Sequence, residues 1–180
     1  ALYIGRLSPE KGLDTLLDAW HASPHIPLKL IGDGPLFEQV QRNINDKCLA
    51  PVTMLGKKNR SETLSYLRAA RLLIVPSLCY ENFPLVIVEA YAMGIPVVAS
   101  RLGAMAEIVK DGITGLLFSP GDHLDLAAKV SWAWQHCQEM EEMGSNARQA
   151  YTERYAKGAN YQILMGAYSF AAKNQKASQH

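Results

Sequence analysis

Cysteine is scarce in this sequence, and the three that occur, Cys48, Cys79 and Cys137, are widely separated. The absence of a C-x-x-C pair argues against a disulfide framework or a zinc site and favours a reducing compartment. The sequence also lacks a hydrophobic run long enough to cross a membrane and a recognisable signal peptide. We therefore expect a cytoplasmic location.

A dominant charge is lacking too, because 18 Lys and Arg side chains are balanced by 17 Asp and Glu side chains, for a net charge of +1. This balance argues against a general binder of nucleic acid, so any phosphate recognition should be local. The histidines show no metal-ligand spacing, and we expect no metal site. A hydrophobic content of 48% over 180 residues is enough for one domain with a real core.

Short apolar runs alternate with helical patterns along the chain. The runs are rich in Leu, Ile and Val, as buried parallel strands are, and the alternation predicts a doubly wound, Rossmann-like α/β sheet of about six parallel strands with helices on both faces. The expected strands are Leu2–Ile4, Leu28–Ile31, Val52–Leu55, Leu72–Val75, Val97–Ala99 and Leu116–Phe118. The expected helices are Gly12–Ala22, Pro35–Asp46, Ser61–Ala70, Pro84–Met93, Met105–Lys110, Asp122–Gln138, Met140–Tyr155 and Asn160–Ala172. We expect one domain over residues 1–172 and a flexible tail over residues 173–180.

Two carboxylates, Glu81 and Glu89, bracket a mostly apolar segment. A charge in such company is costly unless something binds it. Pro84 suits the first position of a helix, so Glu81 is expected before the helix and Glu89 within it. The free N–H groups of residues 85–87 would then point to the same space as Glu81, which is typical of an anion site beside acceptors. The segment favours a phosphate attached to a sugar; the alternative is a solvated loop followed by an amphipathic helix.

Ligands of such sheets lie outside the carboxyl ends of the strands, so the segments that follow strands are the informative ones. After the first strand, Gly5 lets a ligand approach the backbone closely. Arg6 can grip a phosphate with its planar fork, and Lys11 supplies a point charge at the expected start of the next helix. The alternative is a solvated loop with two surface cations.

The segments after the second and third strands give weaker signals. Gly32 belongs to a Gly-Asp-Gly-Pro turn, and turn chemistry explains it fully, although the backbone could also approach a ligand. Gly56 and Lys57 follow the third strand, where their backbone could pair with a nucleobase edge, or the lysine could simply be solvated. Neither a G-x-G-x-x-G motif nor a P-loop is present, so NAD binding and kinase-type chemistry lose support.

Four segments, in this order, resemble glycosyltransferase family 4: GRLSPEKG at residues 5–12, the Glu81…Glu89 spacing, AMGIPVVA at residues 92–99 and DGITG at residues 111–115. The resemblance covers residues 1–150 and points to the carboxyl-terminal, donor-binding half of a GT-B fold, in which two Rossmann-like domains face a cleft. It implies retention of the anomeric configuration, with no metal and no cofactor.

The resemblance also implies roles for individual residues. Arg6 and Lys11 would hold the diphosphate of a nucleotide sugar. Glu81 would be the catalytic-site carboxylate that faces the donor sugar, and Glu89 would accept hydrogen bonds from the ribose hydroxyls. Backbone N–H groups would reach sugar or phosphate oxygens at three positions, Phe83, Leu85 and Val86. Pro84 departs from the family, which often has Gly there, and this leaves the identity of the sugar open.

The expected function is the donor half of an enzyme that transfers a hexose from a UDP-, GDP- or ADP-linked donor to a glycan or lipid-linked acceptor in glycan or polysaccharide biosynthesis. The chain opens inside a strand-like segment, and we expect an N-terminal acceptor-binding domain outside it. The fragment alone would then bind the donor without transferring the sugar. The intact enzyme would be cytoplasmic, with peripheral contact at the inner face of the membrane. A nucleotide-sugar epimerase, a sugar phosphorylase and a non-catalytic nucleotide-binding module stay open as alternatives.

Overall fold

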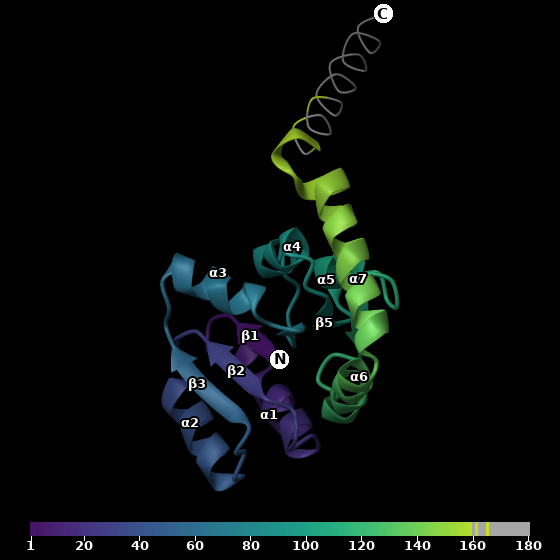
Figure 1. Ribbon diagram of the computed structural model, residues 1–180. Helices are drawn as coiled ribbons and strands as arrows, with labels where there is room; N and C mark the ends of the chain where they lie inside the picture. The colour runs from purple at the N-terminus through teal and green to yellow at the C-terminus, as the bar shows by residue number, and fades with distance from the viewer. Residues whose placement is uncertain (160, 162–164, 166–180) are drawn as a thin grey trace, which may run out of the picture.

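The computed structural model describes residues 1–159, 161 and 165, and its centre is one sheet of parallel strands between two layers of helices (Figure 1). The strand order is β3-β2-β1-β4-β5-β6. The strands are β1 (Leu2–Ile4), β2 (Leu28–Ile31), β3 (Val52–Gly56), β4 (Leu73–Val75), β5 (Val97–Ser100) and β6 (Gly115–Phe118). The predicted doubly wound parallel sheet is therefore confirmed, and the strand ends shift by only one residue at some positions.

The helices follow the strands as the alternation predicts. They are α1 (Leu13–His21), α2 (Phe37–Asp46), α3 (Arg60–Arg68), α4 (Leu85–Ala92), α5 (Gly103–Ile108), α6 (His123–Gln135) and α7 (Cys137–Ala150), with a short 3₁₀ helix η1 at Pro9–Lys11 and a π-helical turn η2 at Tyr151–Tyr155. Most of the predicted helix Asn160–Ala172, and all of the predicted tail, lie outside the described residues.

Strand side chains alternate between two cores, one on each face of the sheet. Tyr3 and Ile74 pack on the face covered by α1, α2 and α6, whereas Leu2 and Leu73 pack on the face covered by α3, α4 and α5 (Figure 1). Both faces are apolar because both are covered, which explains the continuous hydrophobic runs of the sequence. Helix α7 runs beside β6 and contributes to both cores.

The order of the sheet reverses at β1, since β2 follows it on one side and β4 pairs with it on the other. The crossovers leave this centre in opposite directions, and a crevice for ligands forms at the carboxyl ends of strands at such a switch point. The loops after β1 and β4 therefore meet, although they are far apart in the sequence.

The DGITG segment closes the open edge of the sheet. Asp111 Oδ1 accepts a hydrogen bond of 2.9 Å from Leu117 N–H, and Gly112 N–H donates to Gly115 C=O at 2.8 Å. These bonds satisfy edge groups of β6 that would otherwise be open to another strand. The segment is thus explained by the fold, away from the carboxyl ends of the strands. Among the described residues, no helix has the length and apolar character needed to span a membrane.

Candidate functional site

The loops after β1, β2 and β3 are joined to one another by their backbones. Gly5 N–H donates to Ile31 C=O at 3.0 Å, and Gly32 N–H donates to Gly56 C=O at 3.0 Å. Gly32 has φ 153°, and a Cβ there would lie 1.8 Å from the carbonyl oxygen of Gly5. The turn therefore requires glycine for packing alone. Any base contact by Gly32 or Gly56 would have to use backbone atoms other than this engaged pair.

A cavity of about 450 Å³ opens beside these loops. We call it the β1–β2 cavity; its lining residues are Ile4, Gly5, Arg6, Ile31, Gly32, Asp33, Gly34, Lys57, Lys58 and Thr63. The lining includes four of the residues that the sequence singled out, namely Gly5, Arg6, Gly32 and Lys57. Gly56 directly precedes Lys57 in the chain. Three cationic side chains line the cavity against one carboxylate, which suits an anionic ligand.

Glu81 meets two donors at the switch point. Lys11 Nζ lies 2.7 Å from Glu81 Oε1, and the hydroxyl of the buried Ser77 donates to the same oxygen. The side chains of Lys11 and Glu81 are only 24% and 18% exposed, so the pair is well shielded from water. Among the described residues nothing donates to the other oxygen, Oε2, which leaves it available as an acceptor. The sequence reasoning missed Ser77, whose only signal was its position two residues after the end of β4.

The backbone at Gly12 explains how Lys11 reaches this place. Lys11 ends the 3₁₀ helix η1 and does not open α1 as expected, because Gly12 turns the chain with φ 68°. A Cβ at Gly12 would lie 1.9 Å from the carbonyl oxygen of Pro76. Glycine thus lets the loop after β1 approach the loop after β4, and Leu78 N–H completes the contact by donating to Glu10 C=O at 2.8 Å.

Tyr3, in β1, contacts the loop that carries Arg6. Its hydroxyl donates to the carbonyl of Arg6 at 2.8 Å, and its ring lies under Gly5, where a Cβ would be 2.8 Å from the phenol oxygen. Burial raises the pKa of the Tyr3 phenol far above its usual range, and the nearby carboxylates of Glu81 and Glu10 raise this pKa further. Tyr3 is therefore a permanent donor that fixes the backbone beside the cavity.

The start of α4 is less open than expected. The helix begins at Leu85, with Pro84 as its cap, and Ile87 N–H donates to Pro84 C=O at 3.0 Å. The prediction that Ile87 offers a free N–H is therefore wrong, because the first turn closes on itself. Within the described residues the N–H groups of Leu85 and Val86 have no acceptor. The anion site expected here therefore has two free N–H donors in place of three.

Phe83 stands just before this turn, half exposed. Its ring centroid lies 6.1 Å from that of Tyr155 in η2, so the π-helical turn supports the segment that leads into α4. The predicted contact of the Phe83 N–H with a donor stays a prediction.

Glu89 lies in α4 as predicted, and it meets a residue that the sequence reasoning did not consider. Arg60 Nη2, at the first position of α3, lies 3.0 Å from Glu89 Oε1. The described residues therefore place both predicted glutamates near the carboxyl ends of the strands, each in contact with a cation.

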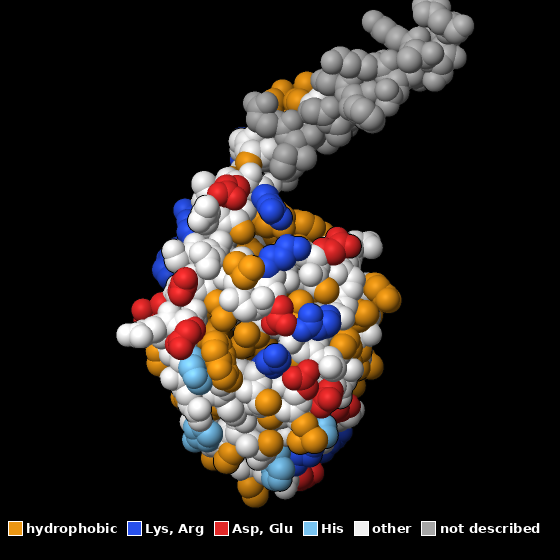
Figure 2. Space-filling model, turned by 90° about the vertical axis from the view of Figure 1, so that its right-hand side faces the viewer, with side chains coloured by type: hydrophobic (Ala, Val, Ile, Leu, Met, Phe, Trp, Pro, Cys, Tyr) orange, Lys and Arg blue, Asp and Glu red, His pale blue; other side chains and the backbone are white. Residues whose placement is uncertain are grey.

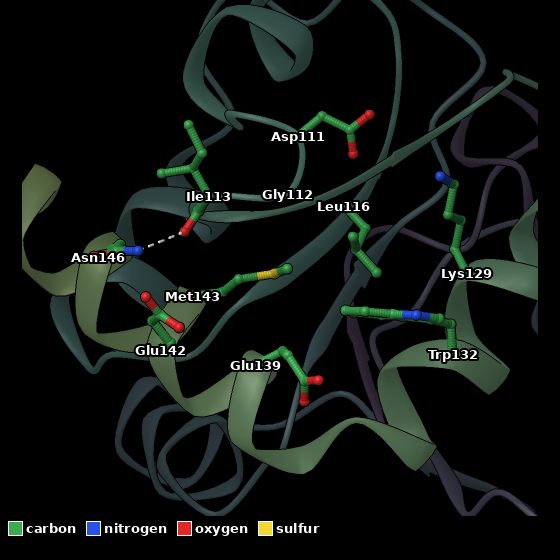
Figure 3. A pocket seen from close by; sticks show the side chains of 10 residues that line it. All are labelled: Asp111, Gly112, Ile113, Leu116, Lys129, Trp132, Glu139, Glu142, Met143 and Asn146. Atoms are coloured by element: carbon green, nitrogen blue, oxygen red, sulfur yellow. Dashed lines mark hydrogen bonds between the residues drawn. The ribbon is translucent and has the colours of Figure 1, made fainter.

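A larger cavity, of about 620 Å³, lies elsewhere, beside the amino-terminal half of β6 (Figure 3). Its lining residues are Asp111, Gly112, Ile113, Leu116, Lys129, Trp132, Glu139, Glu142, Met143 and Asn146. Figure 3 shows Lys129 and Trp132 entering from α6 and the last four residues from α7, with Asn146 donating to Ile113 C=O. Seen from the side of α6 and α7, acidic, basic and hydrophobic side chains are interspersed (Figure 2). This cavity is larger than the β1–β2 cavity, but it lies far from the switch point. We therefore assign the ligand to the β1–β2 cavity.

The described residues contain no group of three or more His, Cys, Asp or Glu side chains that could hold a metal ion.

The family model for glycosyl transferases group 1 matches residues 1–150. The chain belongs to this family. Among its relatives are an uncharacterized glycosyltransferase of Methanocaldococcus jannaschii, 34% identical over 82% of this chain and 42% of the relative, and a sulfoquinovosyl transferase of Arabidopsis thaliana, 30% identical over 94% of this chain and 33% of the relative. The chain thus spans less than half the length of these relatives.

Solved structures agree with the family. Anabaena HepE in complex with UDP is 31% identical, with a TM-score of 0.83 over 93% of this chain and 48% of that one. The complex of the same protein with UDP-glucose gives 30% identity and a TM-score of 0.82 over 93% and 48%. A C-terminal domain of a Francisella tularensis group 1 protein, solved alone, has the same fold at 22% identity and a TM-score of 0.77, over 86% of this chain and 85% of that domain. The predicted Rossmann-like fold of GT-B glycosyltransferases is confirmed, and so is membership of a glycosyltransferase family at the level of group 1. The assignment to glycosyltransferase family 4 stays a prediction.

Proposed function

We propose that this chain is the donor-binding half of a retaining glycosyltransferase, which transfers a hexose from a nucleotide diphosphate sugar to a glycan or lipid-linked acceptor. The observation that carries the proposal is the meeting of Lys11, Ser77 and Glu81 in the loops after β1 and β4. The loop after β1 also supplies Arg6 to the cation-lined β1–β2 cavity. The meeting occurs at the switch point of a sheet shared with a protein crystallised with UDP-glucose. The acceptor is expected on a domain outside this chain.

A uridine nucleotide is the favoured donor, because the HepE complexes contain UDP and UDP-glucose. GDP- and ADP-linked sugars are the alternatives. The β1–β2 cavity receives the nucleotide, with Arg6 at the diphosphate and Lys57 near the base. Glu81 then lies beyond the diphosphate, where Oε2 accepts hydrogen bonds from the sugar hydroxyls, and Glu89 accepts from the ribose.

The chemistry follows from where charge develops. Breaking the bond between the anomeric carbon and the phosphate oxygen leaves negative charge on the diphosphate. Arg6, Lys11 and the N–H groups of Leu85 and Val86 are placed to stabilise that charge. Because the charge grows as the bond breaks, these contacts are stronger in the transition state than with the intact donor, and they lower the activation barrier. The resemblance implies that the leaving phosphate takes the proton of the acceptor hydroxyl, which adds on the same face. Glu81 acts by orienting the sugar.

Calorimetric titration of the chain with UDP, GDP, ADP and UDP-glucose tests the donor site. We expect UDP and UDP-glucose to bind and Arg6→Ala to weaken both by about tenfold or more, the value of a lost charge-assisted contact. Arg42→Ala, at an exposed position of α2, is the matched control and should bind as the wild type does. Failure of every nucleoside diphosphate to bind would refute the donor site. An inverted anomeric configuration in the product of the intact protein would refute retention.

A further inference from the structure

Arg60 connects two helices that flank the site. Its guanidinium Nη2 lies 3.0 Å from Glu89 Oε1, and the two residues are the first of α3 and the fifth of α4. The Arg60 side chain is 78% exposed, whereas that of Glu89 is only 28% exposed. The arginine thus reaches from the surface to a more sheltered carboxylate.

The start of α3 fixes the backbone from which Arg60 reaches. Asn59 caps the helix by accepting from Glu62 N–H at 2.9 Å, and the Glu62 carboxylate accepts from Asn59 N–H at 3.1 Å. This capping box holds the first turn, where Arg60 stands. The neighbouring Lys58 lies 3.8 Å from Glu62 of the same helix, so its charge stays with α3. Arg60 is the cation of this turn that crosses to α4.

The geometry leaves one oxygen of Glu89 for a ligand. Arg60 occupies Oε1, and within the described residues nothing donates to Oε2. The ion pair to Oε1 favours the orientations of the carboxylate in which this oxygen faces Arg60 and Oε2 stays open to a ligand. The ribose of a nucleotide offers two neighbouring hydroxyls, which are donors suited to such a preoriented acceptor.

We propose that Arg60 is a positioning residue for the donor ribose, which orients Glu89 so that Oε2 accepts from the ribose hydroxyls. This inference rests on the proposed function, in which Glu89 binds the ribose. Since Arg60 is largely exposed, its ion pair contributes little to folding, as surface pairs do. Its loss should therefore appear in the affinity for the ribose and hardly in the melting temperature.

The test compares UDP with 2′,3′-dideoxy-UDP, which lacks both ribose hydroxyls, in calorimetric titrations. Glu89→Gln should weaken UDP by about tenfold and leave the dideoxy ligand unchanged. Arg60→Gln should weaken UDP several-fold, also without effect on the dideoxy ligand, and the double variant should be no weaker than Glu89→Gln alone. Arg60→Lys, which keeps the charge but loses the planar fork, should be intermediate. Arg68→Gln, in the last turn of the same helix, is the matched control.

The outcomes separate the two assignments. If Arg60→Gln weakens UDP and the dideoxy ligand equally, Arg60 acts on the phosphates by charge and the inference is wrong. If Arg60→Gln leaves UDP binding unchanged or tightens it, Arg60 is at most a competitor for Glu89, and the inference is again wrong. If Glu89→Gln itself fails to distinguish the two ligands, the ribose placement in the proposed function is wrong, and the role of Arg60 is overturned with it.

Discussion

Lys11 and Glu81 lie 70 residues apart in the sequence and form an ion pair of 2.7 Å between the loops after β1 and β4. The two strands pair directly in the sheet, so the loops that follow them are neighbours at its carboxyl edge. The cation assigned to the leaving diphosphate and the carboxylate assigned to the sugar thus form one unit before the donor arrives. When the donor binds as proposed, Lys11 contacts its diphosphate and Glu81 contacts its sugar.

The first prediction concerns the stability of that pair. Lys11→Ala leaves Glu81, which is only 18% exposed, with Ser77 as its remaining described donor. We expect the free energy of unfolding to fall by about 1–3 kcal/mol, because a sheltered charge loses its partner. Urea denaturation measures it. The double variant Lys11→Ala/Glu81→Gln removes the orphaned charge and should recover part of the loss; a double variant as unstable as the sum of the single ones would contradict the coupling.

The second prediction separates sterics from backbone conformation at two matched glycines. Gly12 and Gly56 have φ 68° and 67°, but a Cβ at Gly12 would lie 1.9 Å from Pro76 C=O, whereas one at Gly56 meets no atom within 4 Å. Gly56→Ala should cost about 1 kcal/mol for the left-handed backbone alone. Gly12→Ala should cost at least about 2 kcal/mol more, because it forces the loops of Lys11 and Glu81 apart. Equal costs in thermal unfolding would rule out the close approach as the reason for glycine.

The sheet could be predicted from the sequence because each strand is a short apolar run that can be recognised from its own residues. Leu73–Val75, for example, is an apolar run between turn residues, buried on both faces, and such runs differ from the amphipathic helices around them. The preference of Pro84 for a helix start placed Glu81 and Glu89 correctly before and within α4. These features depend on the order of residues along the chain.

Contacts between loops could not be predicted in the same way. The Lys11–Glu81 and Arg60–Glu89 pairs depend on which strands and helices become neighbours in space, and nothing in either segment alone specifies its partner. The engagement of Ile87 N–H was missed for a different reason. Pro84 leaves its own carbonyl free to close the first turn, a detail of local geometry that residue types alone do not fix.

The third prediction is a pH dependence at the edge of the sheet. Burial alone would raise the pKa of Asp111, but the hydrogen bond from Leu117 N–H and the Arg101 guanidinium outweigh it and hold this pKa below its usual range. Ionised Asp111 therefore stabilises the fold above the usual pKa of aspartate, and this contribution is lost as the pH falls through the lowered pKa.

Asp111→Ala should accordingly cost about 0.5–1 kcal/mol at pH 7, a modest value because the site is partly exposed. Urea denaturation at pH 7 and pH 3 measures the difference between variant and wild type, which should shrink at the lower pH. A difference that grows on acidification would show that Asp111 is not the stabilising anion of this edge.

The fourth prediction tests the support of the loop after β1. Tyr3→Phe keeps the ring but removes the hydroxyl that donates to Arg6 C=O at 2.8 Å. We expect the affinity for UDP to fall by about three- to tenfold, the value of one hydrogen bond, because Arg6 is no longer held beside the cavity. Tyr66→Phe, on α3 outside the cavity lining, is the matched control. An unchanged affinity for UDP would mean that the loop keeps its position without the phenol.

The last prediction separates the two glutamates along the donor. Glu89→Gln should weaken UDP and UDP-glucose alike, because both carry the ribose. Glu81→Gln should leave UDP nearly unaffected and weaken UDP-glucose by about tenfold, because the lost contact is to a sugar hydroxyl that only the complete donor has. Titration of both variants with both ligands measures the four affinities, and melting temperatures recorded beside them show whether folding is affected. Glu107→Gln, on the exposed surface of α5, should change none of the four. If Glu81→Gln weakens UDP as strongly as Glu89→Gln does, Glu81 lies at the nucleotide and not at the sugar.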